Sequence, residues 1–258
     1  MYSDQELYKK PIIEVSTEKL SKSTDEQVKI RDTMQNEFIN IGSHELRTPI
    51  QPILGLTEIL QHSIKDTEQL QLLDAIVKNA KRLQRLTNEI LDITQIVHHS
   101  LTLMKEQFNL NDVITNIIDD VMPDKHLYKN GKIIELLYRP NDVFVEADKG
   151  RIIQVISNLL INAIKFTKEG FVTIKVEEKS EKDKRKKAVI MLKDTGIGLD
   201  SEILSKLFSK FAINSHRRTD GCMGLGLFIS KNIIEAHGGR IWAENNADGK
   251  GSTFTFIL

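Results

Sequence analysis

Hydrophobic residues in the first hundred positions recur at the spacing of an α-helix. Met34, Phe38 and Ile41 follow one another at steps of four and three, and this pattern predicts a helix from about residue 25 to residue 63. The residues before it, 1–24, are polar and weakly patterned. We therefore interpret that stretch as a linker or as the end of a preceding unit.

A second and longer apolar stripe predicts a helix from about residue 68 to residue 99, after a short polar break at 64–67. Two such helices form an antiparallel hairpin, whose wide apolar face needs more cover than one hairpin gives. Pairing of two hairpins into a four-helix bundle would supply that cover, so the pattern predicts a homodimer. The stripe consists of Leu72, Leu73, Ile76, Ala80, Leu83, Leu86, Ile90, Ile93, Ile96 and Val97.

After about residue 105, short β-rich runs alternate with helical stretches, and this mixture predicts an α+β fold with helices on one face of a sheet. The expected strands are 133–137, 143–146, 171–176, 188–192, 239–243 and 253–258. The expected helices are 110–122, 148–166, 200–208 and 225–237. The predicted domains are a linker at 1–24, a helical hairpin at 25–103 and a second domain at 104–258.

The composition argues against several classes of protein. Lysine plus arginine and aspartate plus glutamate number 36 each, so no net charge favours nucleic acid or an anionic membrane as a partner. The single cysteine, Cys222, excludes an internal disulfide and a cysteine-rich metal site, and it fits a cytoplasmic compartment. The longest uncharged apolar segment, 152–164, is too short to span a bilayer. We expect no membrane segment in this chain; if the natural protein senses a signal across a membrane, another part does so.

His44 lies on a polar side of the first predicted helix. At helical spacing it shares that side with Glu37, Asn40, Arg47 and Gln51, so its ring is expected to face solvent. A lone histidine is more often structural or simply exposed, and on position alone that alternative stays open.

Two prolines and a carboxylate next to His44 favour a chemical role. Pro49 and Pro52 each delete a backbone hydrogen bond and predict a bend just after the histidine, which a helix built only for packing does not need. A neutral imidazole is nucleophilic near pH 7. A carboxylate bonded to one ring nitrogen strengthens the other as an attacker, and Glu45 is the adjacent candidate.

The predicted helix at 148–166 carries three polar residues on one side. Asn158, Asn162 and Lys165 follow at steps of four and three, although asparagine is a poor helix former. Amide oxygens can ligate Mg²⁺, and a lysine can meet a phosphate as a point charge. Two asparagines that cap nearby loops are an equally good interpretation of this pattern alone.

Glycines punctuate the second half of the chain. Gly196 and Gly198 follow Asp194, whose carboxylate could accept a hydrogen bond from an exocyclic amine such as that of adenine. Residues 221–227 are glycine-rich and open a helix, whose N–H groups and dipole suit a polyphosphate. Neither motif has the spacing of a dinucleotide-binding or P-loop. We interpret 249–253 as a hairpin turn.

Five segments, in this order, resemble motifs of the sensor histidine kinases of two-component systems. The likeness covers about residues 30–258, nearly the whole chain. The segments are 38–50 (FINIGSHELRTPI), similar to the H box; 158–167, to the N box; 194–200, to the G1 box; 207–211, to the F box; and 224–227, to the G2 box.

The resemblance implies a dimeric histidine-phosphotransfer bundle followed by a GHKL (Bergerat-type) α/β sandwich, the ATP-binding domain shared with Hsp90, gyrase and MutL. It implies transfer of the γ-phosphoryl of ATP to His44 and then to an aspartate of a response regulator receiver domain. Glu45 would serve as acid and base. Thr48 would orient water in a phosphatase reaction on the regulator. A hinge near 101–106 would let the ATP-binding domain reach His44.

The resemblance also implies the nucleotide site. Asn162 would hold Mg²⁺ with help from Asn158, Lys165 would meet phosphate, and Asp194 would bind adenine. The further residues implied to contact the nucleotide are Phe166, Gly196, Gly198, Phe208, Phe211, Gly224, Leu225 and Gly226.

A lid at about 212–223 is implied as well, from which Arg217 or Arg218 would reach the γ-phosphate. This chain departs from the family there, since Cys222 and Met223 stand where a glycine and a small hydroxyl residue are common. Two other functions are weighed against the kinase. One is an ATPase of the GHKL type that modifies no histidine, and the other is a dimeric scaffold that binds nucleotide poorly.

Overall fold

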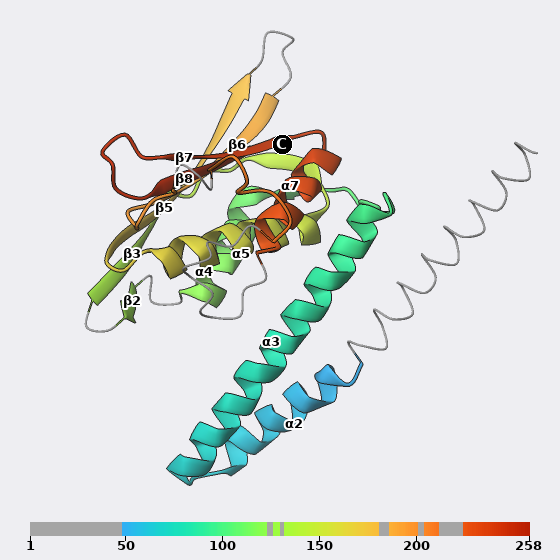
Figure 1. Ribbon diagram of the computed structural model, residues 1–258, viewed down its shortest axis with the longest axis vertical. Helices are drawn as coiled ribbons and strands as arrows, with labels where there is room; N and C mark the ends of the chain where they lie inside the picture. Colours follow the sequence, from blue (N-terminus) through green and yellow to red (C-terminus); the bar gives the residue numbers. More distant parts are fainter. Residues whose placement is uncertain (1–47, 123–125, 130–131, 181–185, 201–203, 212–223) are drawn as a thin grey trace, which may run out of the picture. The chain divides into compact units, whose positions relative to one another are not determined.

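The computed structural model describes residues 48–122, 126–129, 132–180, 186–200, 204–211 and 224–258. The chain divides into two compact units between Ser100 and Leu101. Helix and strand labels follow Figure 1. The start of the first predicted helix and the 1–24 linker lie outside the described residues.

The first unit contains the helices α2, Ile50–Ser63, and α3, Thr67–Val97, packed against each other (Figure 1). Pro52 falls in the first turn of α2, where the missing N–H has no partner within the helix in any case. The polar break is confirmed, because α2 ends at Ser63. Asp66 then accepts a hydrogen bond from the Gln69 N–H and caps α3.

The apolar stripe of α3 is divided between two environments. Its buried members are Leu73 and Ala80, and Leu91, which is not part of the predicted stripe, is buried as well. Ile76, Leu83, Ile90 and Val97 stay 46–52% exposed and repeat every seven residues. One side of the stripe therefore lacks cover from the described part of this unit.

The second unit is built on a six-stranded sheet with the order β2-β3-β5-β6-β8-β7. β3 and β5 are parallel and the other neighbours antiparallel. The strands are β2, His126–Lys129; β3, Lys132–Tyr138; β5, Gly170–Ser180; β6, Lys186–Asp194; β7, Arg240–Asn245; and β8, Ser252–Ile257. A separate pair joins β1, Glu106–Asn109, to β4, Phe144–Ala147.

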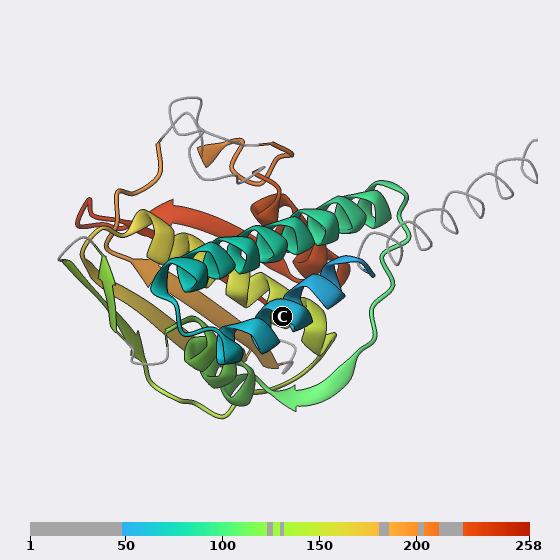
Figure 2. The ribbon, with the colours of Figure 1, turned by 90° about the horizontal axis from the view of Figure 1, so that it is seen from below.

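Three helices lie along one face of this sheet: α4, Leu110–Val121; α5, Lys149–Phe166; and α7, Gly226–Ala236 (Figures 1 and 2). The core forms where their apolar sides meet alternate residues of the strands, and its largest fully buried side chains include Ile134, Ile156, Leu160, Ile190 and Phe256. The predicted α+β architecture with helices on one face is confirmed.

Two details of the predicted elements differ from the structure. Strands β1 and β2, of four residues each, were not predicted, and β1 buries only Phe108, which gives no alternating pattern. The helix predicted over 200–208 is wrong over its second half. A helical bond joins the Leu204 N–H to the Asp200 carbonyl, but 205–211 are turns. The Ser209 hydroxyl and N–H both donate to the Lys206 carbonyl there, and this competes with helix formation.

Within the described parts of the chain, no helix combines the length and the apolar character that a membrane span requires.

Candidate functional site

Helix α5 places its asparagines beside the start of α7. The Asn158 Nδ2 donates to the Ser230 hydroxyl of α7 at 3.0 Å. Gly226, the first residue of α7, leaves room for this amide, since a Cβ there would collide with the Asn158 Oδ1. The predicted N-box and G2-box segments, 68 residues apart at Asn158 and Gly226, are thus in direct contact.

Asn162 lies one turn farther along α5, half-buried, and its amide makes no hydrogen bond within the described part of the chain. The described residues contain no cluster of three His, Cys, Asp or Glu side chains that could enclose a metal. The Asn162 amide oxygen could ligate Mg²⁺ together with water and substrate phosphates, because this cation prefers oxygen ligands. Asn162 fits this role better than Asn158, whose amide already contacts Ser230 and Gly226.

The end of α5 meets the glycine turn after β6. The Ile197 N–H points to the Phe166 carbonyl oxygen at 3.4 Å. The Lys165 ammonium lies 5.6 Å from the centre of the Phe166 ring, and that ring is 40% exposed. A cation and an exposed aromatic face thus lie beside the turn that contains Gly196 and Gly198.

Asp194, the last residue of β6, is 3% exposed and firmly oriented. Its Oδ1 accepts from the Gly196 N–H at 2.8 Å and from the Ser252 N–H at 3.3 Å. Its Oδ2 accepts from the Ser252 hydroxyl at 2.7 Å. A carboxylate has about four acceptor positions, so one more donor, such as an amine, can still bind.

The start of α7 carries the second glycine motif. Gly224 adopts a φ of 68°, and Leu225 is buried at the N-cap position. No side chain of the described residues caps this helix, so its first N–H groups are available to an anion.

The segment 204–211 is attached to the sheet and to α7 through its aromatic and basic residues. Phe208 packs edge-to-face on Phe254 of β8, with ring centres 6.5 Å apart. The Lys210 ammonium lies 5.3 Å from the Phe228 ring of α7. Phe211 has a φ of 59° and is 64% exposed. Phe208 thus packs against the sheet, whereas Phe211 remains accessible to a ligand.

The predicted site residues that precede α2 and those of the lid are mostly not described. Thr48 is exposed two residues before α2. His44 and Glu45, and in the lid Arg217 and Arg218, lie outside the described residues. Their roles stay predictions.

The structure also identifies residues that sequence reasoning missed. Ser252 lies 58 residues from Asp194, and no local pattern announces its bond to that carboxylate. Asp148 is another such residue. Its Oδ1 caps α5 by accepting from the Arg151 N–H, and its Oδ2 accepts from the Met104 N–H at 2.9 Å. The Asp148 N–H donates to His237 Nε2 at 2.9 Å, so Asp148 joins α5 to the end of α7.

Burial raises the pKa of the Asp148 carboxyl, but the hydrogen bonds from Met104 and Arg151 and the Arg151 and His237 charges outweigh this effect. The net pKa of Asp148 is therefore lower than its ordinary value.

Two family models match this chain. The His Kinase A (phospho-acceptor) domain matches residues 34–98. The Histidine kinase-, DNA gyrase B-, and HSP90-like ATPase matches residues 147–258. The order of the two agrees with the two units of the structure.

Curated relatives and solved structures point to the same family. The sensor protein GacS of Pseudomonas syringae pv. syringae is 38% identical over 227 residues, which are 87% of this chain and 25% of GacS. This chain therefore spans about a quarter of that relative. The ShkA structure, solved full-length with AMPPNP, has a TM-score of 0.65 at 25% identity and covers 86% of this chain and 45% of ShkA. The histidine kinase AdeS of Acinetobacter baumannii has a TM-score of 0.55 at 27% identity, covering 83% and 96%.

These matches confirm the family resemblance and the GHKL-type fold of the second unit. The chain belongs to the sensor histidine kinases and carries their HisKA domain followed by their HATPase_c domain.

Proposed function

We propose that this chain transfers the γ-phosphoryl group of ATP to His44, and then to an aspartate of a response regulator receiver domain. One observation carries the proposal. A single domain contains the oriented Asp194 carboxylate, the α5 amides and the start of α7, which no described side chain caps, and it follows a phospho-acceptor domain match that includes His44. The ShkA structure was solved with AMPPNP, an analogue of ATP, and this supports ATP as the substrate.

The residues of the second unit would divide the nucleotide between them. Asp194 would accept a hydrogen bond from the adenine amine, because Ser252 and Gly196 hold its carboxylate in one orientation. The N–H groups of the first turn of α7 and the Lys165 ammonium would meet phosphate oxygens. Asn162 would contribute an amide oxygen to Mg²⁺, which neutralises the phosphate charge when it is bound.

At His44, one ring nitrogen would form a bond to the γ-phosphorus while the bond from that phosphorus to the bridging oxygen breaks and ADP leaves. Glu45 would accept the proton from the other ring nitrogen. An aspartate oxygen of the receiver domain would then attack the same phosphorus and break its bond to His44. In a separate phosphatase reaction, Thr48, which is exposed four residues beyond His44, would orient water for attack on the phosphorylated aspartate of the regulator.

We further propose that the chain works as a homodimer in the cytoplasm, as the cytoplasmic part of a larger sensor. The uncovered apolar residues of α3 and the HisKA match support the dimer. ATP and receiver domains are cytoplasmic partners, which supports the location.

The test is incubation of the full chain with ATP labelled at the γ-phosphate. We expect label on the protein that survives alkali and is lost in acid, because a phosphorus–nitrogen bond is acid-labile. The label should be absent from His44→Gln and retained in His62→Gln, a control at an exposed histidine of α2. Undiminished labelling of His44→Gln would refute the proposal. Release of phosphate without labelled protein would instead favour an ATPase.

A further inference from the structure

Two adjacent asparagines at the end of β7 hold the two ends of the segment 194–199. Asn246 Nδ2 donates to the Asp194 carbonyl oxygen at 2.7 Å. Asn245 makes two bonds with the backbone of Leu199: its Oδ1 accepts from the N–H at 2.7 Å, and its Nδ2 donates to the carbonyl at 2.8 Å. The glycine turn that carries Gly196 and Gly198 is therefore fixed at its beginning and at its end by one short stretch of β7.

The Asn246 side chain is rigidly held in turn. It is 9% exposed, and its Nδ2 also donates to the Lys250 carbonyl at 2.6 Å. Its Oδ1 accepts from the Thr253 hydroxyl at 2.7 Å. Each polar atom of the buried amide thus has a partner, and a network satisfied in this way specifies a single geometry.

The turn between β7 and β8 lies directly against the same segment. Gly251 has a φ of 77°, and a Cβ on it would collide with the Asp194 carbonyl oxygen. The next residue, Ser252, binds the Asp194 carboxylate. The backbone and the carboxylate of Asp194 are therefore both positioned by residues of this turn.

We propose that Asn245 and Asn246 are positioning residues for nucleotide binding, and that the β7–β8 turn is the support that aims Asp194 at the base. The proposal rests on the proposed function and deepens it. A turn that only joins two antiparallel strands does not need a network of side-chain amides, because backbone hydrogen bonds between the strands are enough to hold it. The network extends instead to the one segment expected to contact adenine.

The two asparagines should have separable effects. Asn246 holds the Asp194 carbonyl and also bonds Lys250 and Thr253 on either side of Ser252. Its loss should therefore loosen the Ser252 bonds that orient the Asp194 carboxylate and reduce discrimination for the 6-amino group of the base. Asn245 fixes Leu199, five residues after Asp194. Its loss should therefore loosen the glycine turn and lower the affinity for nucleotides with and without that amine to the same degree.

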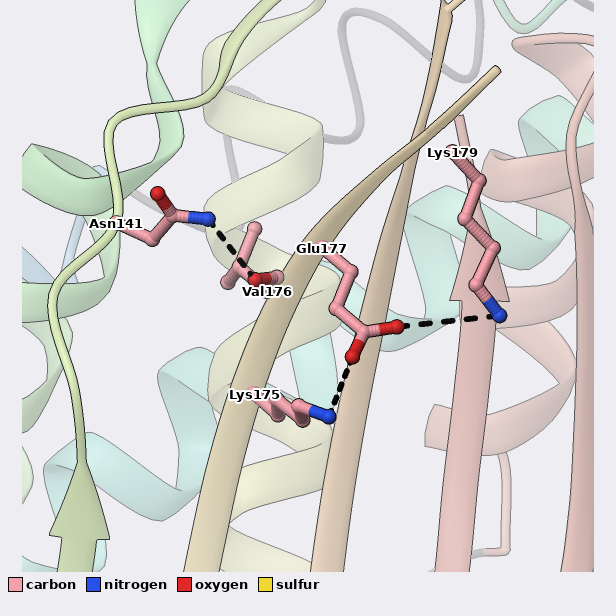
Figure 3. A network of polar contacts seen from close by, with 5 residues as sticks. All are labelled: Asn141, Lys175, Val176, Glu177 and Lys179. Atoms are coloured by element: carbon pink, nitrogen blue, oxygen red, sulfur yellow. Dashed lines mark hydrogen bonds and ion pairs between the residues drawn. The ribbon is translucent and has the colours of Figure 1, made fainter.

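The experiment titrates the full chain with Mg²⁺ and either ATP or purine riboside triphosphate, which lacks the 6-amine. The variants are Asn245→Ala and Asn246→Ala. Asn141→Ala is the matched control, since its amide also donates to a backbone carbonyl, that of Val176 at 3.2 Å, on β5 (Figure 3). Each titration is run at a temperature at which the thermal unfolding curve shows the variant to be folded.

We expect Asn245→Ala to bind both nucleotides about tenfold more weakly than wild type, as for the loss of about one to two hydrogen bonds. For Asn246→Ala we expect the affinity for ATP to fall about tenfold. The ratio of the affinities for ATP and purine riboside triphosphate should fall toward one. Asn141→Ala should match wild type. A merely structural role for Asn246 would weaken both nucleotides equally, and that result overturns the proposal for this residue.

A milder variant keeps the test decisive if an alanine variant does not fold. Asn245→Asp retains the acceptor for the Leu199 N–H but turns the donor that faces the Leu199 carbonyl into a second acceptor, so its affinity for ATP should also be lower than that of wild type. Affinity of Asn245→Asp or Asn245→Ala equal to that of Asn141→Ala overturns the role of Asn245, while the proposed function stands. If wild type binds neither nucleotide, the proposed function itself fails.

Discussion

At the scale of single residues, Gly251 and Gly249 form a natural pair for comparison. Both have φ near 75°, where a side chain costs about 1 kcal/mol, but only Gly251 faces the Asp194 backbone; around Gly249 a Cβ would meet nothing within 4 Å. We predict that Gly251→Ala lowers the free energy of unfolding by about 1–3 kcal/mol more than Gly249→Ala, because a backbone collision adds to the strain. Urea unfolding of the two variants measures the difference, and equal losses would contradict the close approach.

Gly226 faces a side chain rather than backbone, so a different result is expected. In Gly226→Ala the Asn158 amide can rotate away, and the better helix propensity of alanine, about 1 kcal/mol, offsets the lost bond to Ser230. We therefore predict that Gly226→Ala leaves the free energy of unfolding nearly unchanged but removes the hydrogen bond between Asn158 and Ser230. A double-mutant cycle should show that Ser230→Ala costs about 1 kcal/mol in wild type and close to nothing in the Gly226→Ala background. Equal costs in both backgrounds would show that the amide had not moved.

How far the sequence predicts this site depends on how local each signal is. Asp194, Gly196 and Gly198 lie within five residues of one another, so their order alone predicted that they lie close together, as the bond from the Gly196 N–H to Asp194 shows. Asn158 and Gly226 were each assigned to a motif, but their contact depends on how α5 packs on α7. Ser252 lies in what the sequence indicates to be a hairpin turn, and only the register of β6 with β8 brings it to Asp194.

At the scale of elements, the long periodic helices were predicted closely, whereas the short strands β1 and β2 were missed. α5 and α7 have complete apolar sides, and their observed bounds differ from the predicted ones by about one residue. β2 has four residues and gains its structure from pairing with β3, which its own sequence does not encode. The turn at 205–211 depends on the contacts of Phe208 and Lys210 with distant elements.

Backbone hydrogen bonds on both sides narrow the position of the hinge predicted between the two units. The predicted hinge spans 101–106, but Glu106 pairs with Ala147 in the sheet of β1 and β4, and the Met104 N–H is bonded to Asp148. On the other side, the Ser100 N–H bonds to the Gln95 carbonyl at the end of α3. Residues 101–103 lie between these two sets of bonds, so a hinge such as the family resemblance implies would fall there.

Asp148 at the start of α5 leads to a prediction of pH dependence. Its pKa in the folded chain is lower than its ordinary value of 3.8, so its charged form stabilises the fold at all pH values above that value. As the pH falls below 3.8, the unfolded chain takes up the proton first, and the contribution is lost as the pH passes the folded pKa. Asp148→Asn keeps a capping oxygen but loses the acceptor for Met104, so we predict a loss of about 1 kcal/mol at pH 7. That gap should shrink below pH 3.8.

Urea unfolding from pH 7 down to about 3 measures this gap, with Asp120→Asn on the exposed side of α4 as the control. The control should track wild type across the whole range. A gap for Asp148→Asn that stays constant with pH would show that the charge does not contribute, and that only the shape of the cap matters.

At the scale of the whole molecule, the residues of α3 that stay exposed in the described part of the chain support the proposed second copy. Ile76, Leu83, Ile90 and Val97 recur every seven residues, the repeat with which paired helices keep one seam facing a partner. Fully covering an aliphatic side chain gains about 1.5–3 kcal/mol, so a partially exposed seam of this length can support a stable dimer.

We predict that the double variant Leu83→Glu/Ile90→Glu converts the proposed dimer to a monomer. Each of its two substitutions places a charge in the seam of both copies. Arg82→Glu, at an exposed position one residue away, changes charge to a similar degree without entering the seam and should remain dimeric. Sedimentation equilibrium of the full chain distinguishes the two masses. The monomeric variant should still bind Mg²⁺ and ATP as wild type does, because every described residue of the proposed nucleotide site belongs to the second unit. If the double variant stays dimeric, another surface joins the copies. If it is monomeric but no longer binds ATP, the second unit depends on the pairing of α3.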